Sequence, residues 1–442
     1  MSTPVLPATA RTLLARTARV QRDGRAPSLV AGVVRDGGLV WSTGRGDVVE
    51  PHGDVQYRLG SISKTVTAVA VLRLRDEGLL DLDDPLERHV PGTPFGDRTV
   101  GQLLAHVAGA AAESPGQWWE RAPGGSLDDL QLGAEHVVLG AARRFHYSNL
   151  GFGLLGELVA RLRGRSWADV VRAEVLEPLG MTRTTPRPVA PAAEGRAVHP
   201  WADVVLPEPE HDAGVMAAAG QLWATLADLA RFAAFLLGDT GDVLAPATLE
   251  EMTVPAGVDS SAPGWSAYGL GLQVLRVDGQ TLVGHGGSMP GFLAGVFVDR
   301  DEQTGAVSLA NTTTGLDPLL PGLLADLRAA EPRVVEPWTP SAPPVPLEVL
   351  GVWFWGPGPH LLRALPGGLL HLGPLPGRAG RASRFARRDD GAWVGLDGYH
   401  AGEPLRIGED HLDVGTFVFT RTPYDPAAPV PGGVDPRGWT AT

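Results

Sequence analysis

Apolar runs typical of β-strands gather at the two ends of residues 1–330, and a helical pattern fills the stretch between them. Residues 28–43 predict two strands joined at Asp36-Gly37, a dipeptide that favours the tight turn of a hairpin. The later strand-like runs are residues 268–277, 280–285, 292–298 and 305–311. We expect the strands from both ends to pair in one antiparallel sheet, with the helical region as an insertion.

Between these strands, apolar residues recur at helical spacing. The predicted helices cover residues 64–78, 149–163, 167–177 and 222–237. Ser148 is the expected N-cap of the second helix, because its hydroxyl can accept a hydrogen bond from the first turn. The predicted fold class is therefore α+β, an antiparallel sheet flanked by helices and joined to a helical subdomain.

A proline-rich stretch separates this region from a second predicted domain. Residues 331–347 contain six prolines and predict a stiff linker. Residues 348–425 hold short apolar runs between Gly and Pro, which predict a small all-β domain, a sandwich or a barrel. Residues 426–442 are expected to be a loose tail. The first domain would then be residues 1–330.

Composition and charge exclude several classes of function. A net charge of −13 argues against a nucleic-acid partner, which needs a basic face. The absence of Cys removes disulfides and cysteine nucleophiles, and the 12 His form no cluster with metal-site spacing, so no metal and no cofactor are expected. The N-terminus lacks a signal-peptide pattern, and no segment approaches the roughly 18 apolar residues of a membrane span. We therefore expect a cytoplasmic protein with no membrane partner.

Lysine usage singles out one position. Lys64 is the only lysine among the 37 basic residues, so the other 36 are arginines. Arginine keeps its proton in a protein whereas lysine can lose it. Ser61 lies three residues before Lys64 at the expected start of a helix, so the two side chains share a face. A buried, neutral Lys64 would take the proton of a nucleophilic Ser61; in the alternative, Ser61 only caps the helix and Lys64 faces solvent.

Two further motifs carry candidate chemistry. In Tyr147-Ser148-Asn149, a phenol beside a cationic lysine can act as general base and acid, and the Asn149 amide suits a contact with a substrate carbonyl or with the lysine. The alternative is a half-buried aromatic followed by a helix cap. In His285-Gly286-Gly287-Ser288, glycines on a strand admit a close ligand or backbone, and the alternative is a simple bulge with a surface histidine.

Together, SISK at 61–64, YSN at 147–149 and HGG at 285–287 follow the order and approximate spacing of one superfamily. Over about residues 10–330 the chain resembles the serine hydrolases of the class C β-lactamase, D,D-peptidase (penicillin-binding protein) and family VIII carboxylesterase group. The resemblance implies the β-lactamase/transpeptidase-like fold, with the site where the sheet meets the helical subdomain. The C-terminal β-domain resembles the lipocalin-like domain of some members.

The resemblance also implies roles for the motif residues. Ser61 would be the acylated nucleophile, Lys64 and Tyr147 would share the proton transfers, and Asn149 would position that pair or the substrate. The oxyanion hole would be formed by the backbone N–H groups of Ser61 and Ser288. Which of Lys64 and Tyr147 is the base stays open.

The third motif departs from the Lys-Thr-Gly that classical β-lactamases carry. His285 would bind a substrate carboxylate as a weaker and pH-dependent anchor, because its unperturbed pKa is near 6.5. Efficient antibiotic hydrolysis is therefore not expected, whereas esterases and D-amino-acid peptidases of the superfamily tolerate His here. His106 looks like the structural histidine of the family.

The leading expectation is a hydrolase of a small-molecule or peptide substrate that cleaves an ester or amide through an acyl-Ser61 intermediate. The alternative is a penicillin-binding-protein-type thioesterase that releases and cyclises a nonribosomal peptide, with a peptidyl carrier protein as partner. A third hypothesis is a non-catalytic binding protein on the same fold.

Overall fold

The structure is a computed structural model, which describes residues 3–260, 266–313, 315–316, 318–335, 337–388, 390–415 and 417–423. The chain divides into two compact units, Met1–Val334 and Val335–Thr442, and the division falls within the stretch predicted as a linker, residues 331–347. The predicted tail, residues 426–442, lies outside the described residues. No helix in the described part of the chain is both long enough and apolar enough to cross a membrane.

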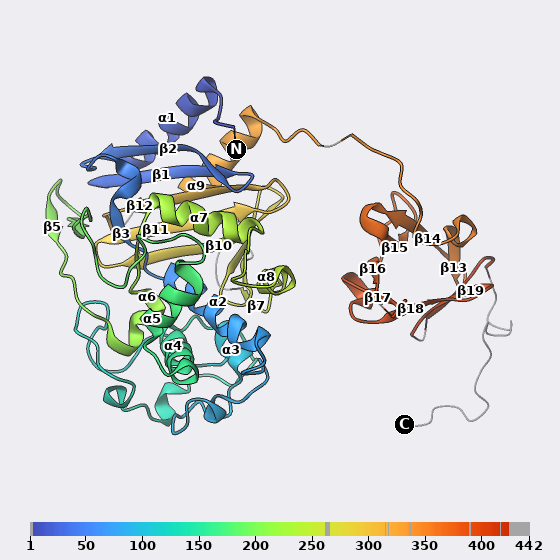
Figure 1. Ribbon diagram of the computed structural model, residues 1–442, viewed down its shortest axis with the longest axis horizontal. Coiled ribbons are helices and arrows are strands. Elements are labelled where there is room, and N and C mark those ends of the chain that lie inside the picture. Colours follow the sequence, from blue (N-terminus) through green and yellow to red (C-terminus); the bar gives the residue numbers. More distant parts are fainter. Residues whose placement is uncertain are drawn as a thin grey trace. The chain divides into compact units, whose positions relative to one another are not determined.

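Eight strands of the first unit form one sheet in the order β2-β1-β12-β11-β10-β9-β8-β7 (Figure 1). The strands are β1 (Ser28–Arg35), β2 (Gly38–Gly46), β7 (Gly257–Asp259), β8 (Ser266–Tyr268), β9 (Gln273–Val277), β10 (Gln280–Met289), β11 (Phe292–Asp299) and β12 (Thr304–Ala310). All neighbours are antiparallel, and the pairing of Leu29 with Ala310 joins the two ends of the unit, as the sequence predicted. The turn between β1 and β2 has φ values of 50° at Asp36 and 74° at Gly37, the conformation that this dipeptide favours.

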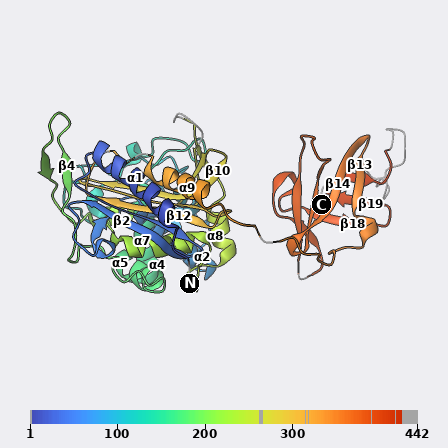
Figure 2. The ribbon, with the colours of Figure 1, turned by 90° about the horizontal axis from the view of Figure 1, so that it is seen from above.

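Each face of the sheet packs against helices (Figure 2). Along β1, Leu29 and Val33 belong to one hydrophobic cluster with α1 (Pro7–Asp23) and α9 (Leu319–Ala330). Val30, on the opposite face, belongs to the cluster that includes α7 (Leu226–Leu237). Because successive strand residues face opposite sides, one strand contributes to both layers of the core.

The chain between β2 and β7 is mainly helical and begins with a short strand. Its helices and short strands are β3 (Gln56–Arg58), α2 (Ile62–Asp76), α3 (Val100–Leu104), α4 (Asn149–Arg163), α5 (Trp167–Val171), a π-helix (Arg172–Leu176), β4 (Arg196–Val198), β5 (Val205–Pro207), α6 (Ala217–Gly220), β6 (Trp223–Thr225) and α8 (Pro246–Met252). The prediction of one helix over 222–237 was wrong at its start, because residues 223–225 form β6, which pairs with β3. The pairing satisfies the backbone of β6, and the Thr225 hydroxyl then accepts from Asp228 N and caps α7.

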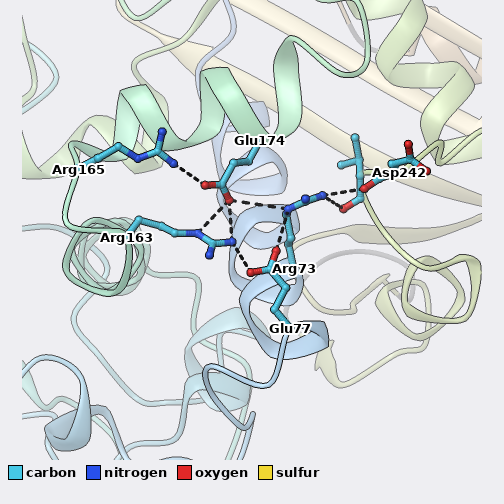
Figure 3. A network of polar contacts seen from close by, with 7 residues as sticks. Arg73, Glu77, Arg163, Arg165, Glu174 and Asp242 are labelled. Atoms are coloured by element: carbon cyan, nitrogen blue, oxygen red, sulfur yellow. Dashed lines mark hydrogen bonds and ion pairs between the residues drawn. The ribbon is translucent and has the colours of Figure 1, made fainter.

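A cluster of charged side chains ties the C-terminal halves of α2 and α4 to the π-helix (Figure 3). The Glu174 carboxylate accepts hydrogen bonds from Arg163 at 3.0 Å and from Arg165 at 2.5 Å, and Arg163 also contacts Glu77 at 2.7 Å. Arg73 of α2 lies 3.8 Å from Glu174 and 3.2 Å from Glu77. The side chains of Glu174 and Arg163 are only 17% and 16% exposed, so water replaces these contacts poorly.

We expect Glu174→Gln to destabilise the first unit by about 1–3 kcal/mol, because three arginines lose the charge that they share. The measurement is the urea midpoint followed by tryptophan fluorescence. The matched control is Glu177→Gln, which breaks an ion pair whose partners are 51% and 52% exposed and should cost less than about 1 kcal/mol. Equal midpoints for the two variants would contradict the structural role given to Glu174.

The second unit is a closed barrel of eight antiparallel strands. The strands are β13 (Gly351–Trp355), β14 (Gly358–Leu365), β15 (Leu369–Pro374), β16 (Ser383–Arg387), β17 (Trp393–Gly395), β18 (Pro404–Ile407), β19 (His411–Val414) and β20 (Phe417–Thr420). Its core is formed by its own apolar side chains, among them Trp353, Phe385 and Trp393. The all-β C-terminal domain predicted from the sequence is confirmed, and of the two expected forms it is the barrel.

Candidate active site

Ser61 and Lys64 come together at the start of α2, directly after β3. Lys64 Nζ lies 3.0 Å from Ser61 Oγ and donates a second hydrogen bond of 2.8 Å to the carbonyl oxygen of Ala219 in α6. The lysine side chain is fully buried, and the Ser61 hydroxyl makes no capping hydrogen bond to the helix. The alternative in which Ser61 is only a cap and Lys64 faces solvent is therefore wrong.

Burial controls the protonation of Lys64. Loss of solvent disfavours the ammonium form and lowers the pKa of Lys64 to about 7, while the negative charges of Glu113 and Glu120 act in the opposite direction. A substantial fraction of Lys64 is thus a neutral amine near pH 7. An amine in that state, 3.0 Å from a serine hydroxyl, has the geometry of a general base.

Tyr147 also contacts this serine and lies in the loop that leads into α4. Its phenol hydrogen-bonds with Ser61, and its ring centre is 5.0 Å from Lys64 Nζ. Burial raises the pKa of Tyr147 well above its ordinary value, so the phenol keeps its proton at neutral pH. At neutral pH a protonated Tyr147 phenol and a partly neutral Lys64 amine therefore lie beside the same serine.

His106 fixes the loop that carries Tyr147. Its Nδ1 accepts a 3.0 Å hydrogen bond from Ser148 N, and its ring packs 4.2 Å from the Tyr147 ring, centre to centre. Burial holds the pKa of His106 well below 6.5, which keeps Nδ1 available as an acceptor. The Ser148 hydroxyl accepts from Gly151 N at 2.8 Å, so the expected N-cap of this helix is present.

Asn149 does not reach the lysine. Its Nδ2 donates to both oxygens of Glu113, at 2.8 and 2.9 Å, and Trp119 donates to the same carboxylate at 2.6 Å. Of the two contacts expected for Asn149, with a substrate carbonyl or with the lysine, the second is absent, and Lys64 donates instead to the Ala219 carbonyl oxygen. Glu113 was missed because it stands alone in a loop, with no motif or periodicity to mark it.

The third motif lies on β10, where Gly287 and Ser288 pass close to the chain around Ser61. A Cβ on Gly287 would lie 1.8 Å from the Leu59 carbonyl oxygen and 3.2 Å from Ser61 N, so only glycine fits there without movement. Met289 of β10 pairs with Phe292 of β11 at the end of the hairpin. In an antiparallel ladder every second residue directs its N–H group away from the partner strand, and from this pair onward those residues are Ser288 and Gly286. Gly286 N accordingly donates to the Gln273 side chain at 3.1 Å.

His285 is a buried residue of β10, and both of its ring nitrogens contact protein groups. Its Nε2 lies 2.9 Å from the Tyr268 hydroxyl, and its Nδ1 lies against the Gly286 carbonyl oxygen. Burial, reinforced by the nearby Lys64, lowers the pKa of His285 to about 3. The expectation of a pH-dependent cationic anchor was therefore wrong, because the imidazole is neutral throughout the physiological range.

A cavity of about 670 Å³ opens over these groups. Ser61, Tyr147 and Ser288 line one part of it. The apolar side chains that line the remainder include Leu275, Leu293, Phe297, Leu316, Leu319 and Leu320. The site thus combines a small polar centre with a larger apolar wall, which suits a substrate with an apolar group beside the reacting bond. Among the described residues, no three His, Asp or Glu side chains are grouped to hold a metal ion.

With neutral Lys64 as the hypothesised base, we expect kcat/KM for a small ester to rise with pH through a midpoint near 7, because the pKa of Lys64 is about 7. In Glu113→Gln the midpoint should move to lower pH, since the charge that favours the ammonium form is gone. Glu135→Gln, an exposed carboxylate in a neighbouring turn, is the control and should leave the midpoint unchanged. A profile that is flat between pH 5 and 9 would contradict this assignment.

Known proteins resemble both units. The beta-lactamase family model matches residues 11–330, and a model described as a domain of unknown function (DUF7586) matches residues 342–421. The chain is 29% identical over 320 residues to a human beta-lactamase-like protein, and this match covers 66% of the chain but only 63% of the human protein. The octameric penicillin-binding protein homologue from Pyrococcus abyssi has the same fold, with a TM-score of 0.66 and 21% identity over 93% of this chain and 99% of its own. A D-stereospecific amidohydrolase from Streptomyces sp. superposes with a TM-score of 0.61 and 25% identity, over 74% of this chain and 99% of its own.

Proposed function

We propose that this chain, which belongs to the beta-lactamase family of serine hydrolases, cleaves small esters and amides through an acyl-enzyme on Ser61. The observation that carries the proposal is the buried, partly neutral Lys64 amine 3.0 Å from the Ser61 hydroxyl. Nothing in a helix cap or a structural core requires a lysine in that position. Its use as a proton acceptor does require one.

In the proposed reaction, Lys64 Nζ takes the proton of Ser61 Oγ as the oxygen bonds to the substrate carbonyl carbon. The negative charge that develops on the carbonyl oxygen accepts hydrogen bonds from Ser61 N–H and Ser288 N–H. When the bond to the leaving group breaks, Tyr147 gives that group its proton and recovers one from the Lys64 ammonium. Water then attacks the acyl-Ser61 ester by the same transfers in reverse, which releases the acid and restores the serine.

For the acyl group, we propose a D-configured amino acid with a free α-amine. The Streptomyces neighbour is a D-stereospecific amidohydrolase, and Glu113 places a carboxylate against Asn149, two residues after Tyr147. A negative charge there attracts an ammonium group. The expected result is faster hydrolysis of D-phenylalanine p-nitroanilide than of the L-isomer or of the N-acetylated D-isomer. Glu113→Gln should remove most of the advantage of the free amine.

A fluorophosphonate probe tests the proposal directly. We expect a stoichiometric mass increase on the peptide that contains Ser61, and no increase in Ser61→Ala. Ser63→Ala is the matched control, because Ser63 is on the same helix turn but bonds to Leu222 N instead of facing the cavity. An adduct that persists in Ser61→Ala would overturn the assignment of the nucleophile.

The second candidate is a thioesterase that releases and cyclises a nonribosomal peptide bound to a peptidyl carrier protein. The closed eight-stranded barrel favours this function. The sequence of the C-terminal domain resembles the lipocalin-like domain of such thioesterases. In this reaction an amine of the substrate, rather than water, attacks the acyl-Ser61 ester. A peptidyl thioester that ends in a D-residue separates the two functions, because hydrolysis gives only the linear acid.

A further inference from the structure

The C-terminal barrel has a cavity of its own, with a volume of about 260 Å³. Its walls include four aromatic side chains, Trp355 of β13, Phe417 and Phe419 of β20, and Tyr399 of the 3-10 helix Gly398–His400. The Phe417 ring centre lies 5.3 Å from that of Trp355 and 5.7 Å from that of Tyr399. Trp355 and Tyr399 are 49% and 48% exposed, so the cavity has an aromatic rim open to solvent.

Three polar residues, His360, Arg381 and His400, also line this cavity, and the last two carry the argument. The Arg381 guanidinium stacks over the Tyr399 ring at 3.9 Å from its centre, and no carboxylate among the described residues pairs with it. His400, only 7% exposed, also lines the cavity. Its Nδ1 is held by Glu403 at 2.7 Å, and its Nε2 has no hydrogen-bond partner in the described part of the chain. A buried histidine with one ring nitrogen left for a ligand, beside an exposed arginine without a carboxylate partner, gives the cavity groups that a polar ligand could bind.

We infer that the barrel binds a small aromatic carboxylate. An aromatic cage alone would attract a cation, but Arg381 repels cations and offers a carboxylate charge-assisted hydrogen bonds. The ligand ring would pack among Trp355, Tyr399 and Phe417, and His400 Nε2 would hold a polar substituent. This inference does not depend on the reaction proposed for Ser61.

The size of the cavity limits the ligand to about one ring with a short side chain, because drug-sized ligands occupy cavities from about 300 Å³ upward. Two sources share this chemistry: a free aromatic acid, and the carboxy-terminal aromatic residue of a peptide. If the ligand is a peptide, its last residue occupies the cavity and the preceding residues extend into solvent past the exposed rings of Trp355 and Tyr399.

Calorimetric titration of the full chain tests the inference with four probes: 3-phenylpropionate, 3-phenylpropanol, 3-phenylpropylamine and Gly-Gly-Phe. The acid should bind with one-to-one stoichiometry, the neutral alcohol at least tenfold more weakly, and the amine more weakly still. Binding of Gly-Gly-Phe would identify peptide termini as ligands, and its failure beside a bound 3-phenylpropionate would identify free acids. No binding of either carboxylate, or tighter binding of the amine, would overturn the inference.

Variants place the binding in the barrel rather than at Ser61. Arg381→Gln should weaken 3-phenylpropionate at least tenfold and leave the alcohol unchanged, and Trp355→Ala should weaken both. Arg378→Gln, an exposed arginine in the same loop that does not line the cavity, is the matched control and should leave all affinities unchanged. Equal losses in Arg378→Gln and Arg381→Gln would show a non-specific charge effect and contradict the site.

Discussion

Lys64→Arg is expected to lower kcat/KM for an activated ester by about 10²–10⁴-fold, although it keeps the positive charge. The lysine is the proton acceptor in the proposed reaction, and its pKa of about 7 makes the neutral amine available. A guanidinium stays protonated in any protein environment, so it cannot take the Ser61 proton. The measurement is steady-state hydrolysis of p-nitrophenyl acetate, with fluorophosphonate labelling of Ser61 as a second readout.

Because Lys64 is fully buried, the larger arginine also strains its surroundings, and a second variant separates the two effects. Lys64→Met has almost the same shape as lysine and no removable proton. It should fold with a urea midpoint close to that of the parent and lose activity to a similar extent. Near-normal turnover in either variant would show that Lys64 is not the base.

Gly287→Ala is also expected to have a large effect, a loss of about 10²–10³-fold in kcat. The added methyl would lie 1.8 Å from the Leu59 carbonyl oxygen, so β10 must move away from the chain around Ser61. That movement separates the Ser61 and Ser288 N–H groups, which the proposed reaction needs on one oxygen atom. Removal of a single such donor costs an enzyme a comparable factor.

The neighbouring glycine is a matched control for this variant. A Cβ on Gly286 would meet only the Gln273 side-chain oxygen, at 3.9 Å, so Gly286→Ala should stay within a few-fold of the parent. Far-UV circular dichroism and urea midpoints of both variants show whether the sheet has formed. A folded Gly287→Ala protein with parental kcat would contradict the oxyanion hole proposed here.

The sequence predicted correctly those elements whose conformation depends on neighbouring residues in the chain, such as a tight turn or a capped helix. The Asp36-Gly37 turn adopts the left-handed backbone that the dipeptide favours, and the helix over 149–163 has the predicted bounds because Ser148 caps its start. Pairing with β3 overrode the helical pattern at residues 223–225. The helix over 319–330 was not predicted, because Pro321 and Gly322 interrupt its pattern; the proline stands in the first turn, where it is tolerated.

The same distinction holds at the site. Ser61 and Lys64 are three residues apart on one helix, so their contact could be expected from the sequence. The Ala219 carbonyl that binds Lys64 lies 155 residues away along the chain, and no local pattern marks it. The neutrality of His285 depends on its burial against Tyr268, which also follows only from the tertiary fold.

The pairing of β1 with β12, from opposite ends of the first unit, affects how the chain folds during synthesis. Ser28 Oγ donates to Asn311 Oδ1 at 2.7 Å across a separation of 283 residues. At about 5–20 residues per second, β1 and β2 leave the ribosome roughly 15–60 seconds before β12 is available to pair with them. During that interval the edge of β1 is an open template for pairing with other nascent chains. We therefore expect the yield of folded protein to depend on translation rate and chaperone supply more than its equilibrium stability would suggest.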